Sequence, residues 1–441
     1  MTISIVLQFV IVLAAIWMGA RSSGVGLGLW GAVGLLVLVV VFGVNPTSPP
    51  IDVMLIILAV IMAASVMDAA GGIDYLVRIA ERIIRANPKY VTIIAPLTTW
   101  SFTFVAGTGH IVYPLLPVIY ETAHQNGIRP ERPMAVATIA SQQAITASPV
   151  AAATAAMIGL FSEKGLTHWG LPQILMICVP ATLTGVLVAA IVSMFVGKDL
   201  KDDPEYQARL ASGAIPPPKA ADVRPVLKPA AKLSAMLFLM GVAFVVLFGF
   251  FPALRHLPGA KGPLGMPIVI EIVMLSVAAV MLVATKVPVD DVPRTPTLRA
   301  GVVAVIGIFG LAWLGDSFIG AHQNVIVPAI SAMTEAAPWT FALGLFAASV
   351  LLYSQAATTR ALMPLGVALG IPPQFLIAVF PSVNGYFFIP TYGSLIAAIN
   401  FDLSGTTKIG KYVLNHSFMI PGLVATFVAV LTGLVLAKLM F

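Results

Sequence analysis

The sequence predicts an all-α polytopic membrane protein built from two inverted repeats, with about 10 spans and two re-entrant hairpins. Of its 441 residues, 59% are hydrophobic and only 10% are charged, whereas about a quarter of an ordinary soluble domain is charged. Apolar runs close to the ~20 residues that cross a bilayer recur from end to end. Loops that carry Lys and Arg alternate with loops that lack them, which is the pattern of the positive-inside rule.

The composition also argues against several other classes of protein. The net charge of +6 does not indicate nucleic-acid binding, because the basic residues lie in loops between spans. The single cysteine, Cys178, lies in an apolar run and excludes a disulfide or a cysteine metal cluster. Neither GxSxG nor HExxH is present and the six histidines are dispersed. We therefore predict no enzyme, no catalytic residue, no metal site and no resident cofactor.

The first repeat, residues 1–197, is expected to begin outside the membrane. Three spans bring the chain inside, where the segment DYLVRIAERIIRANPK places an apolar face opposite its arginines. This pattern predicts a helix lying in the cytoplasmic interface. The three spans are expected at about 3–20, 24–43 and 51–70.

Two short apolar segments follow, and neither is long enough to span. The next loop, GIRPERP, is basic again, so the chain has returned to the side from which it came. This predicts a re-entrant hairpin over about 90–120 that enters from the cytoplasm. Residues 134–160 then cross to the outside with a break at QQAITASP, and 170–197 return to a polar cytoplasmic linker, 198–231.

The same order of segments recurs in the second repeat, residues 232–441, in the opposite orientation. An odd number of crossings separates the copies, so the second hairpin, about 338–370, is expected to enter from the periplasm. An amphipathic segment, HQNVIVPAISAMTE, precedes it. Both termini are expected in the periplasm. The other spans are expected at 232–252, 266–285, 299–318, 374–400 with a break, and 412–438.

Polar residues match between the copies at positions where an internal repeat would place them. VMDAAGG corresponds to LGDSFIG, GTGHIVYPL to ATTRALMPL, and ASQQAITASP to PSVNGYFFIP. The paired residues are Asp68 with Asp316, Thr108 with Thr358, His110 with Arg360, Ser141 with Ser382, and Gln143 with Asn384.

The helix breaks predict the substrate site. An unpaired backbone group in hydrocarbon costs several kcal/mol, so broken helices are tolerated only where they line a cavity or site inside the protein. Half-helix N-termini offer free N–H groups and positive dipole ends, which suit an anionic substrate. The predicted substrate-binding residues are Gly107, Thr108, Gly109, His110, Ser141, Gln143, Thr358, Thr359, Arg360, Ser382 and Asn384.

Structural alternatives remain open for these residues. His110 could cap the second half-helix of its hairpin, the threonines could satisfy backbone carbonyls, and the polar residues at the broken spans could bond neighbouring helices. Arg360 could pair with Asp316 or Asp68, two residues expected to orient neighbours rather than bind substrate. In the functional interpretation, a guanidinium inside the membrane marks a site. Arg360 and His110 then hold the two carboxylates of one substrate.

Long blocks of the sequence are similar to one family of transporters. They include PPIDVMLIILAVIMAAS, GTGHIVYPLLPVIYE, NGIRPERPMA, IPTYGSLIAAI and FDLSGTTKIG. These blocks resemble the anaerobic C4-dicarboxylate transporter (Dcu) family of the ion-transporter superfamily, over nearly the whole chain. The resemblance implies a carrier of fumarate, succinate, malate and aspartate in the bacterial inner membrane, a homodimer, and an elevator mechanism. The sequence departs from the family after SQAA, at Thr358, Thr359 and Arg360.

We therefore expect a secondary transporter that exchanges small C4-dicarboxylates across the lipid bilayer. A carrier of another organic anion, coupled to Na+ or H+, is the alternative within the same class. A channel is disfavoured because channels seldom need inverted repeats of broken helices.

Overall fold

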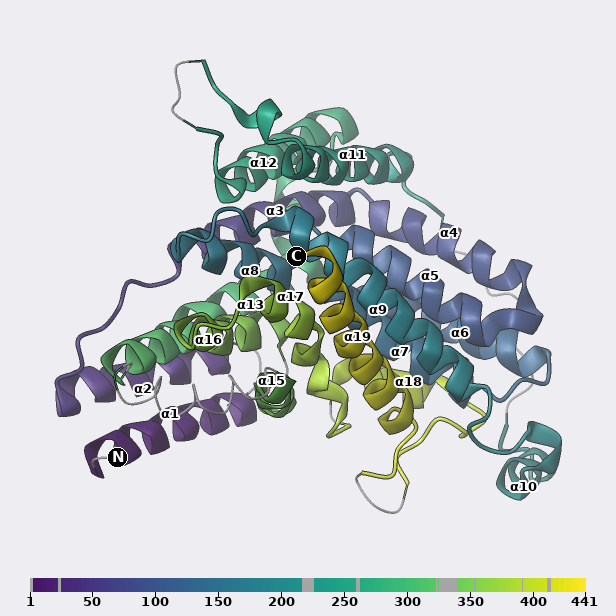
Figure 1. Cartoon of the computed structure of the whole chain (residues 1–441). Coiled ribbons are helices and arrows are strands. Elements are labelled where there is room, and N and C mark those ends of the chain that lie inside the picture. Colours follow the sequence, from purple (N-terminus) through teal and green to yellow (C-terminus); the bar gives the residue numbers. More distant parts are fainter. Residues whose placement is uncertain are drawn as a thin grey trace.

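The fold is an assembly of α-helices, several of which are interrupted (Figure 1). Within the described residues the chain forms α-, 3-10 and π-helices and no strand, with only isolated β-bridges. The prediction of an all-α membrane protein is therefore confirmed. The computed structural model describes residues 3–22, 25–215, 226–258, 262–322, 324, 339–352, 354–390, 392–410 and 414–441.

The chain begins with a hydrophobic pair of helices, α1 (Ile3–Ser22) and α2 (Gly26–Phe42), which pack against each other. Next comes α3 (Ile51–Ala69), whose length and hydropathy suit a membrane span. The predicted amphipathic helix is α4 (Gly72–Ala86). Its buried residues recur at every fourth position, so one face packs against α5, α6 and α11 while the arginines lie on the other faces.

The first predicted hairpin consists of two short helices joined at a sharp break. The helix α5 (Val91–Ala106) follows a 3-10 turn, η1 (Pro88–Tyr90), and ends at Gly107. A second 3-10 turn, η2 (Gly109–Ile111), leads directly into α6 (Val112–Gln125). The two arms pack against each other, as the hairpin prediction requires.

The next span is interrupted where the sequence predicts a break. The helix α7 (Glu131–Gln143) ends in a 3-10 turn, η3 (Ala144–Thr146), and helical structure resumes at α8 (Ala152–Glu163). The uninterrupted α9 (Leu171–Ser193) follows. The polar linker contains η4 (Leu200–Asp202) and α10 (Pro204–Ala211).

The second half of the chain follows the polar linker. Two long apolar helices come first, followed by α13, which continues through a π-helical turn, η7, so that one helix runs from Pro296 to His322. The second hairpin and the second broken span come next. The elements are α11 (Ala231–Phe250), η5 (Pro252–Arg255), α12 (Met266–Thr285), η6 (Val289–Arg294), α13 (Pro296–Gly307), η7 (Ile308–Ala312), α15 (Trp339–Leu352), α16 (Gln355–Ala368), α17 (Pro373–Val379), η8 (Phe380–Phe387), α18 (Gly393–Phe401) and α19 (Met419–Met440).

The start of the last predicted span is wrong by several residues. That span was expected from residue 412, but α19 begins at Met419. Hydrogen bonds hold the residues just before α19 in a non-helical form: Ser417 Oγ accepts from the backbone N–H of Lys408 at 2.9 Å, and the backbone N–H of Ser417 donates to the Lys408 carbonyl at 3.0 Å. Most of the segment HQNVIVPAISAMTE lies outside the described residues.

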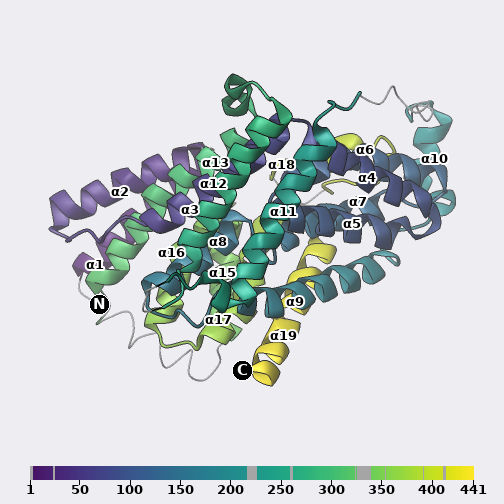
Figure 2. The same cartoon turned by 90° about the horizontal axis from the view of Figure 1, so that it is seen from above.

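Six of the described helices are long and apolar enough to cross a membrane, and several shorter apolar helices accompany them. In Figure 1 the pair α11–α12 lies at the top and the pair α1–α2 at the lower left, and α9 and α19 lie side by side in both views (Figures 1 and 2). The helix α3 packs on α12 and α13, and α2 packs on η7. The first break and both hairpin tips lie next to α3 and α13, which places the candidate site there.

Candidate functional site

A cavity of about 170 Å³ lies where the broken helices meet α3 and α13. Its polar side is formed by both hairpin tips and the first broken span, and its other wall by small apolar residues. None of the described residues that line it is Asp, Glu, Lys or Arg. The lining residues are Val60, Ile61, Ala64, Ala106, Gly107, Thr108, Gly109, His110, Gln142, Ile145, Val150, Ala152, Ala153, Thr297, Ala300, Gly301, Ala304, Ser354, Gln355, Ala356 and Tyr392.

The first hairpin tip depends on two glycines. Gly107 ends α5 with φ of 71°, in the left-handed region that other residues rarely adopt. A Cβ on Gly109 would lie 2.2 Å from the Nε2 atom of Gln142, so this glycine allows the tip to touch the broken span. Both glycines line the cavity, and their predicted contact with the substrate stays a prediction.

Thr108 and His110 complete the first tip. The backbone N–H of His110 donates to Thr108 Oγ1 at 3.3 Å, so the hydroxyl of Thr108, and not the ring of His110, caps the second arm. The His110 side chain is exposed, lines the cavity and stacks against Tyr113 with ring centroids 5.8 Å apart. The imidazole is therefore available to a ligand.

The second hairpin tip brings residues to the cavity that the sequence did not single out. Ser354 Oγ accepts from the backbone N–H of Ala357 at 3.2 Å and caps α16. Ser354 and Gln355 line the cavity. The predicted residues Thr358 and Thr359 instead donate to the carbonyls four residues earlier in the chain, at 2.8 and 2.7 Å. They are buried and do not line the cavity, which agrees with the structural alternative.

A network of side-chain amides joins the cavity to the protein interior. Gln355 Nε2 donates to Gln142 Oε1 at 2.9 Å and to Asn384 Oδ1 at 3.1 Å. Asn384 Nδ2 donates to Gln143 Oε1 at 3.2 Å, and Gln143 Nε2 donates to Thr426 Oγ1 at 2.8 Å. The network therefore links the first break, the second tip, the second break and α19. Gln142 and Gln355 reach the cavity, whereas Gln143 and Asn384 lie behind them.

The two predicted serines are buried and lie outside the cavity lining. Ser141 Oγ donates to the carbonyl of Thr138 at 2.7 Å, within its own helix. The carbonyl of Ser382 accepts from Ser349 Oγ at 3.4 Å. Neither serine reaches the cavity in this conformation, so their contact with the substrate stays a prediction.

Arg360 is paired with acids rather than directed into the cavity. Its Nη2 atom lies 2.7 Å from Glu163 Oε2 and 3.4 Å from Asp316 Oδ2. Pairing with Asp316 is the structural alternative that the sequence left open, and Glu163 was not foreseen. Asp68 accepts a hydrogen bond from Thr297 Oγ1 at 2.7 Å. The predicted role of Arg360 in holding a carboxylate stays a prediction, because this structure places its guanidinium elsewhere.

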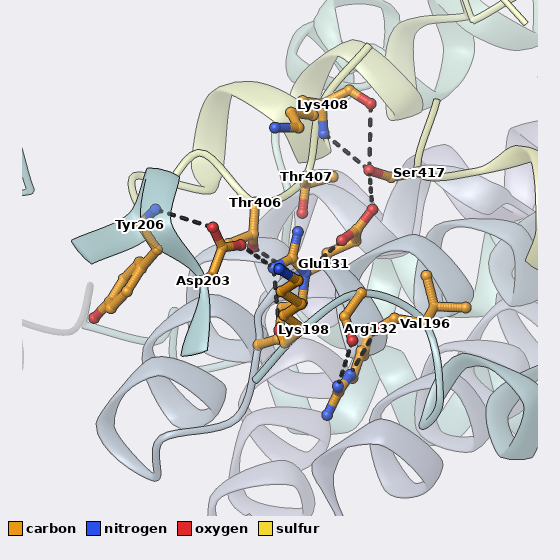
Figure 3. Close-up of polar contacts among 12 residues, drawn as sticks. Glu131, Arg132, Val196, Lys198, Asp203, Tyr206, Thr406, Thr407, Lys408 and Ser417 are labelled. Atoms are coloured by element: carbon orange, nitrogen blue, oxygen red, sulfur yellow. Dashed lines mark hydrogen bonds and ion pairs between the residues drawn. The ribbon is translucent and has the colours of Figure 1, made fainter. Parts of the chain in front are cut away.

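A second polar cluster joins three distant segments (Figure 3). Arg129 pairs with Glu131 at 2.6 Å and also with Asp203 of the linker. Glu131 accepts from Ser417 Oγ at 2.7 Å, and its backbone N–H donates to Thr406 Oγ1 at 3.1 Å. The loop after α6, the linker and the segment before α19 therefore meet at one place, and the sequence predicts all three on the cytoplasmic side.

Ion pairing controls the charges of this cluster. Burial works against the charged form of Arg129, but its carboxylate partners raise the pKa of its guanidinium. Burial likewise opposes the charged form of Asp203, yet the hydrogen bond and charge of Arg129 lower the pKa of its carboxyl. Both groups are therefore charged at neutral pH.

Broken helices that converge on a cavity in an all-helical membrane protein define a membrane transporter rather than an enzyme. The chain belongs to the anaerobic C4-dicarboxylate membrane transporter family, whose model matches residues 4–441. It is a multi-pass protein of the bacterial inner membrane.

Related proteins match over nearly their full length. The C4-dicarboxylate transporter DcuA of Wolinella succinogenes is 40% identical over 437 residues, covering 99% of this chain and 100% of the relative. DcuA of Escherichia coli K12 is 42% identical over 437 residues, covering 99% and 100%. The anaerobic C4-dicarboxylate transporter DcuB of Escherichia coli O157:H7 is 39% identical over 439 residues, covering 98% of both chains.

A solved structure shares the fold at low sequence identity. Neisseria gonorrhoeae MtrF, described as illuminating a class of antimetabolite efflux pumps, superposes with a TM-score of 0.51. It is 13% identical, and the match covers 100% of this chain and 95% of that one. The likeness concerns the fold alone.

Proposed function

We propose that the chain carries C4-dicarboxylates such as succinate, fumarate, malate and aspartate by exchanging one for another, and that they bind in the cavity between the hairpin tips. One observation supports this most strongly: three helix starts meet at a cavity whose described lining has no acidic side chain. They are the starts of η2 with α6, of α8 and of α16. Their positive dipole ends and the donors of His110, Gln142 and Ser354 suit an anion.

The size of the cavity also favours a small substrate. Its volume of about 170 Å³ falls below the roughly 300–1,000 Å³ of pockets for drug-sized ligands. A four-carbon dianion can place one carboxylate at each tip. We assign the first tip to Thr108 and His110, and the second to Ser354 and the backbone N–H groups at the start of α16. As in the sequence-based model, each carboxylate of the substrate is bound at its own hairpin tip. The second carboxylate is now bound by neutral donors instead of Arg360.

Packing between helices supports the inverted repeat. The contact of α3 with α12 has its counterpart in the contact of η7 with α2. The contact of α5 with α7 has its counterpart in that of α15 with η8, and α9 packs on its own counterpart, α19. Matching contacts of this kind, in which a helix of one copy packs on the same helix of the other copy as its counterpart does, are expected for two copies related by a pseudo-twofold axis. We propose the orientation with both termini periplasmic and the linker cytoplasmic.

The cavity walls suit an elevator type of alternating access. The second tip and both breaks are joined by the amide network, and Gly109 of the first tip lies against Gln142, so we infer that they move as one unit with the substrate. The opposing wall on α3 and α13 is formed mostly by Ala, Gly, Val and Ile, which make no hydrogen bonds that sliding would break. The homodimer implied by the resemblance is kept as a prediction, which cross-linking in membranes would check.

Counterflow in proteoliposomes tests the function. Vesicles loaded with unlabelled succinate should accumulate labelled fumarate, and vesicles loaded with butyrate should not. Replacing external sodium with choline should leave the exchange rate unchanged. Uptake that requires sodium or a proton gradient, and no counter-substrate, would favour the ion-coupled carrier instead.

A further inference from the structure

An ion triad built around one buried guanidinium lies apart from the cavity and joins three elements. Arg360 on α16, with a side chain only 3% exposed, contacts Glu163 at the end of α8 and Asp316 on the helix that continues from α13. Two donors of Arg360, Nε and Nη1, have no hydrogen-bond partner among the described residues. A buried guanidinium with unused donors is held less firmly than a fully bonded one.

The triad and the cavity involve opposite ends of one helix, Pro296–His322. The helix Pro296–His322 lines the cavity with residues from Thr297 to Ala304. Asp316 lies roughly 18 Å farther along this helix than Ala304, at about 1.5 Å per residue. The cavity therefore extends toward the start of the helix, which the charge pattern places on the cytoplasmic side. At the other end of the helix, the triad joins it to the second hairpin through Arg360 and Asp316.

The equivalent positions at the cavity end are not joined in this way. His110 and Asp68 match Arg360 and Asp316 in the repeat, and both are described, yet the structure records no ion pair between them. His110 stacks on Tyr113 and is exposed, while Asp68 accepts from Thr297. At the periplasmic end, an ion pair therefore joins the second hairpin to the helix Pro296–His322. At the cytoplasmic end, no ion pair joins His110 to Asp68.

We propose that Arg360 is a latch that closes the periplasmic side of the substrate cavity by tying the second hairpin to Asp316. The proposal rests on the function proposed above, because a latch matters only to a carrier with alternating access. The contact with Glu163 is shorter than that with Asp316, at 2.7 against 3.4 Å. When the periplasmic side opens, Arg360 stays with Glu163 and parts from Asp316.

The latch can be tested with one reporter cysteine. Ala152 lines the cavity at the start of α8, so Ala152→Cys in a Cys178→Ala background reports access to the cavity. An impermeant maleimide is applied to right-side-out and inverted vesicles that contain the full-length protein. Arg360→Gln and Asp316→Asn should each raise the labelling rate from the periplasmic side about tenfold or more, by shifting the population toward that state. The Kd for succinate should not change.

Two comparisons keep this result interpretable. Asp52→Asn removes an exposed acid at the start of α3, on the same predicted side, and should leave labelling unchanged. Asp316→Asn preserves the pair of Arg360 with Glu163, so it carries the test if Arg360→Gln does not fold.

Each outcome bears on a different claim. Unchanged periplasmic labelling in both variants would refute the latch. A weaker succinate Kd in Arg360→Gln without a change in labelling would also refute it and would make Arg360 a substrate ligand. If succinate fails to protect the reporter cysteine in the otherwise native protein, the proposed binding site fails and the latch falls with it.

Discussion

Gly109→Ala should weaken dicarboxylate binding through a single displaced amide. The added Cβ would lie 2.2 Å from Gln142 Nε2, whereas ordinary contacts begin near 3.4 Å. The amide must therefore retreat by about 1 Å, which stretches its 2.9 Å hydrogen bond with Gln355 past the bonding range. Leaving buried amide groups unpaired costs about 1–3 kcal/mol. At 1.4 kcal/mol for each tenfold change, the Kd for succinate should rise about 5- to 150-fold.

Isothermal titration of the purified protein with succinate measures this effect. Gly344→Ala is the matched control, because nothing lies within 4 Å of its added Cβ. A double-mutant cycle isolates the clash: in a Gln142→Ala background, Gly109→Ala should cost little more. A normal Kd in Gly109→Ala, or the same loss in both backgrounds, would refute the proposed role of this contact.

Three other predictions follow from the same contacts. Asn384→Ala should slow exchange and lower the melting temperature, because a buried glutamine amide on each side loses a partner; fast exchange with normal melting would contradict this. The Asp203 carboxylate, whose pKa is lowered by Arg129 from an ordinary 3.8, should stabilise the protein fully above that value and lose its effect as pH falls through the lower folded pKa. The difference in melting temperature between wild type and Arg129→Gln should therefore shrink in acid, and a difference that grows would be contrary to the model. Cysteines introduced at Ser212 and Leu257 should label from the cytoplasm and the periplasm respectively, and labelling from one side would overturn the orientation.

The fold could largely be predicted from local features of the sequence. Apolar runs and the glycines near Gly107 mark the helices and the first break, because both depend on neighbouring residues. The start of α19 could not be found in this way. Ser417, two residues before α19, is held by hydrogen bonds with Lys408, and an apolar run does not reveal such contacts.

The candidate site was harder to predict, because adjacent residues on a helix point about 100° apart. Matching the two repeats selects Gln143, yet its neighbour Gln142 reaches the cavity. Arg360 was marked by its charge in an apolar region, but its partner Glu163 lies nearly two hundred positions away in the chain and comes close only in the fold. Sequence patterns therefore locate the tips and breaks, while the side chains that face the cavity depend on tertiary packing.

The location of the bound substrate decides whether the cavity between the hairpin tips is the binding site. A crystal structure with 2-bromosuccinate would mark the ligand by its anomalous scattering. One peak is expected in the cavity, within contact distance of Thr108, Gln142 and Ser354. A peak beside Arg360 with an empty cavity, or no peak between the hairpin tips at a saturating concentration, would contradict this expectation.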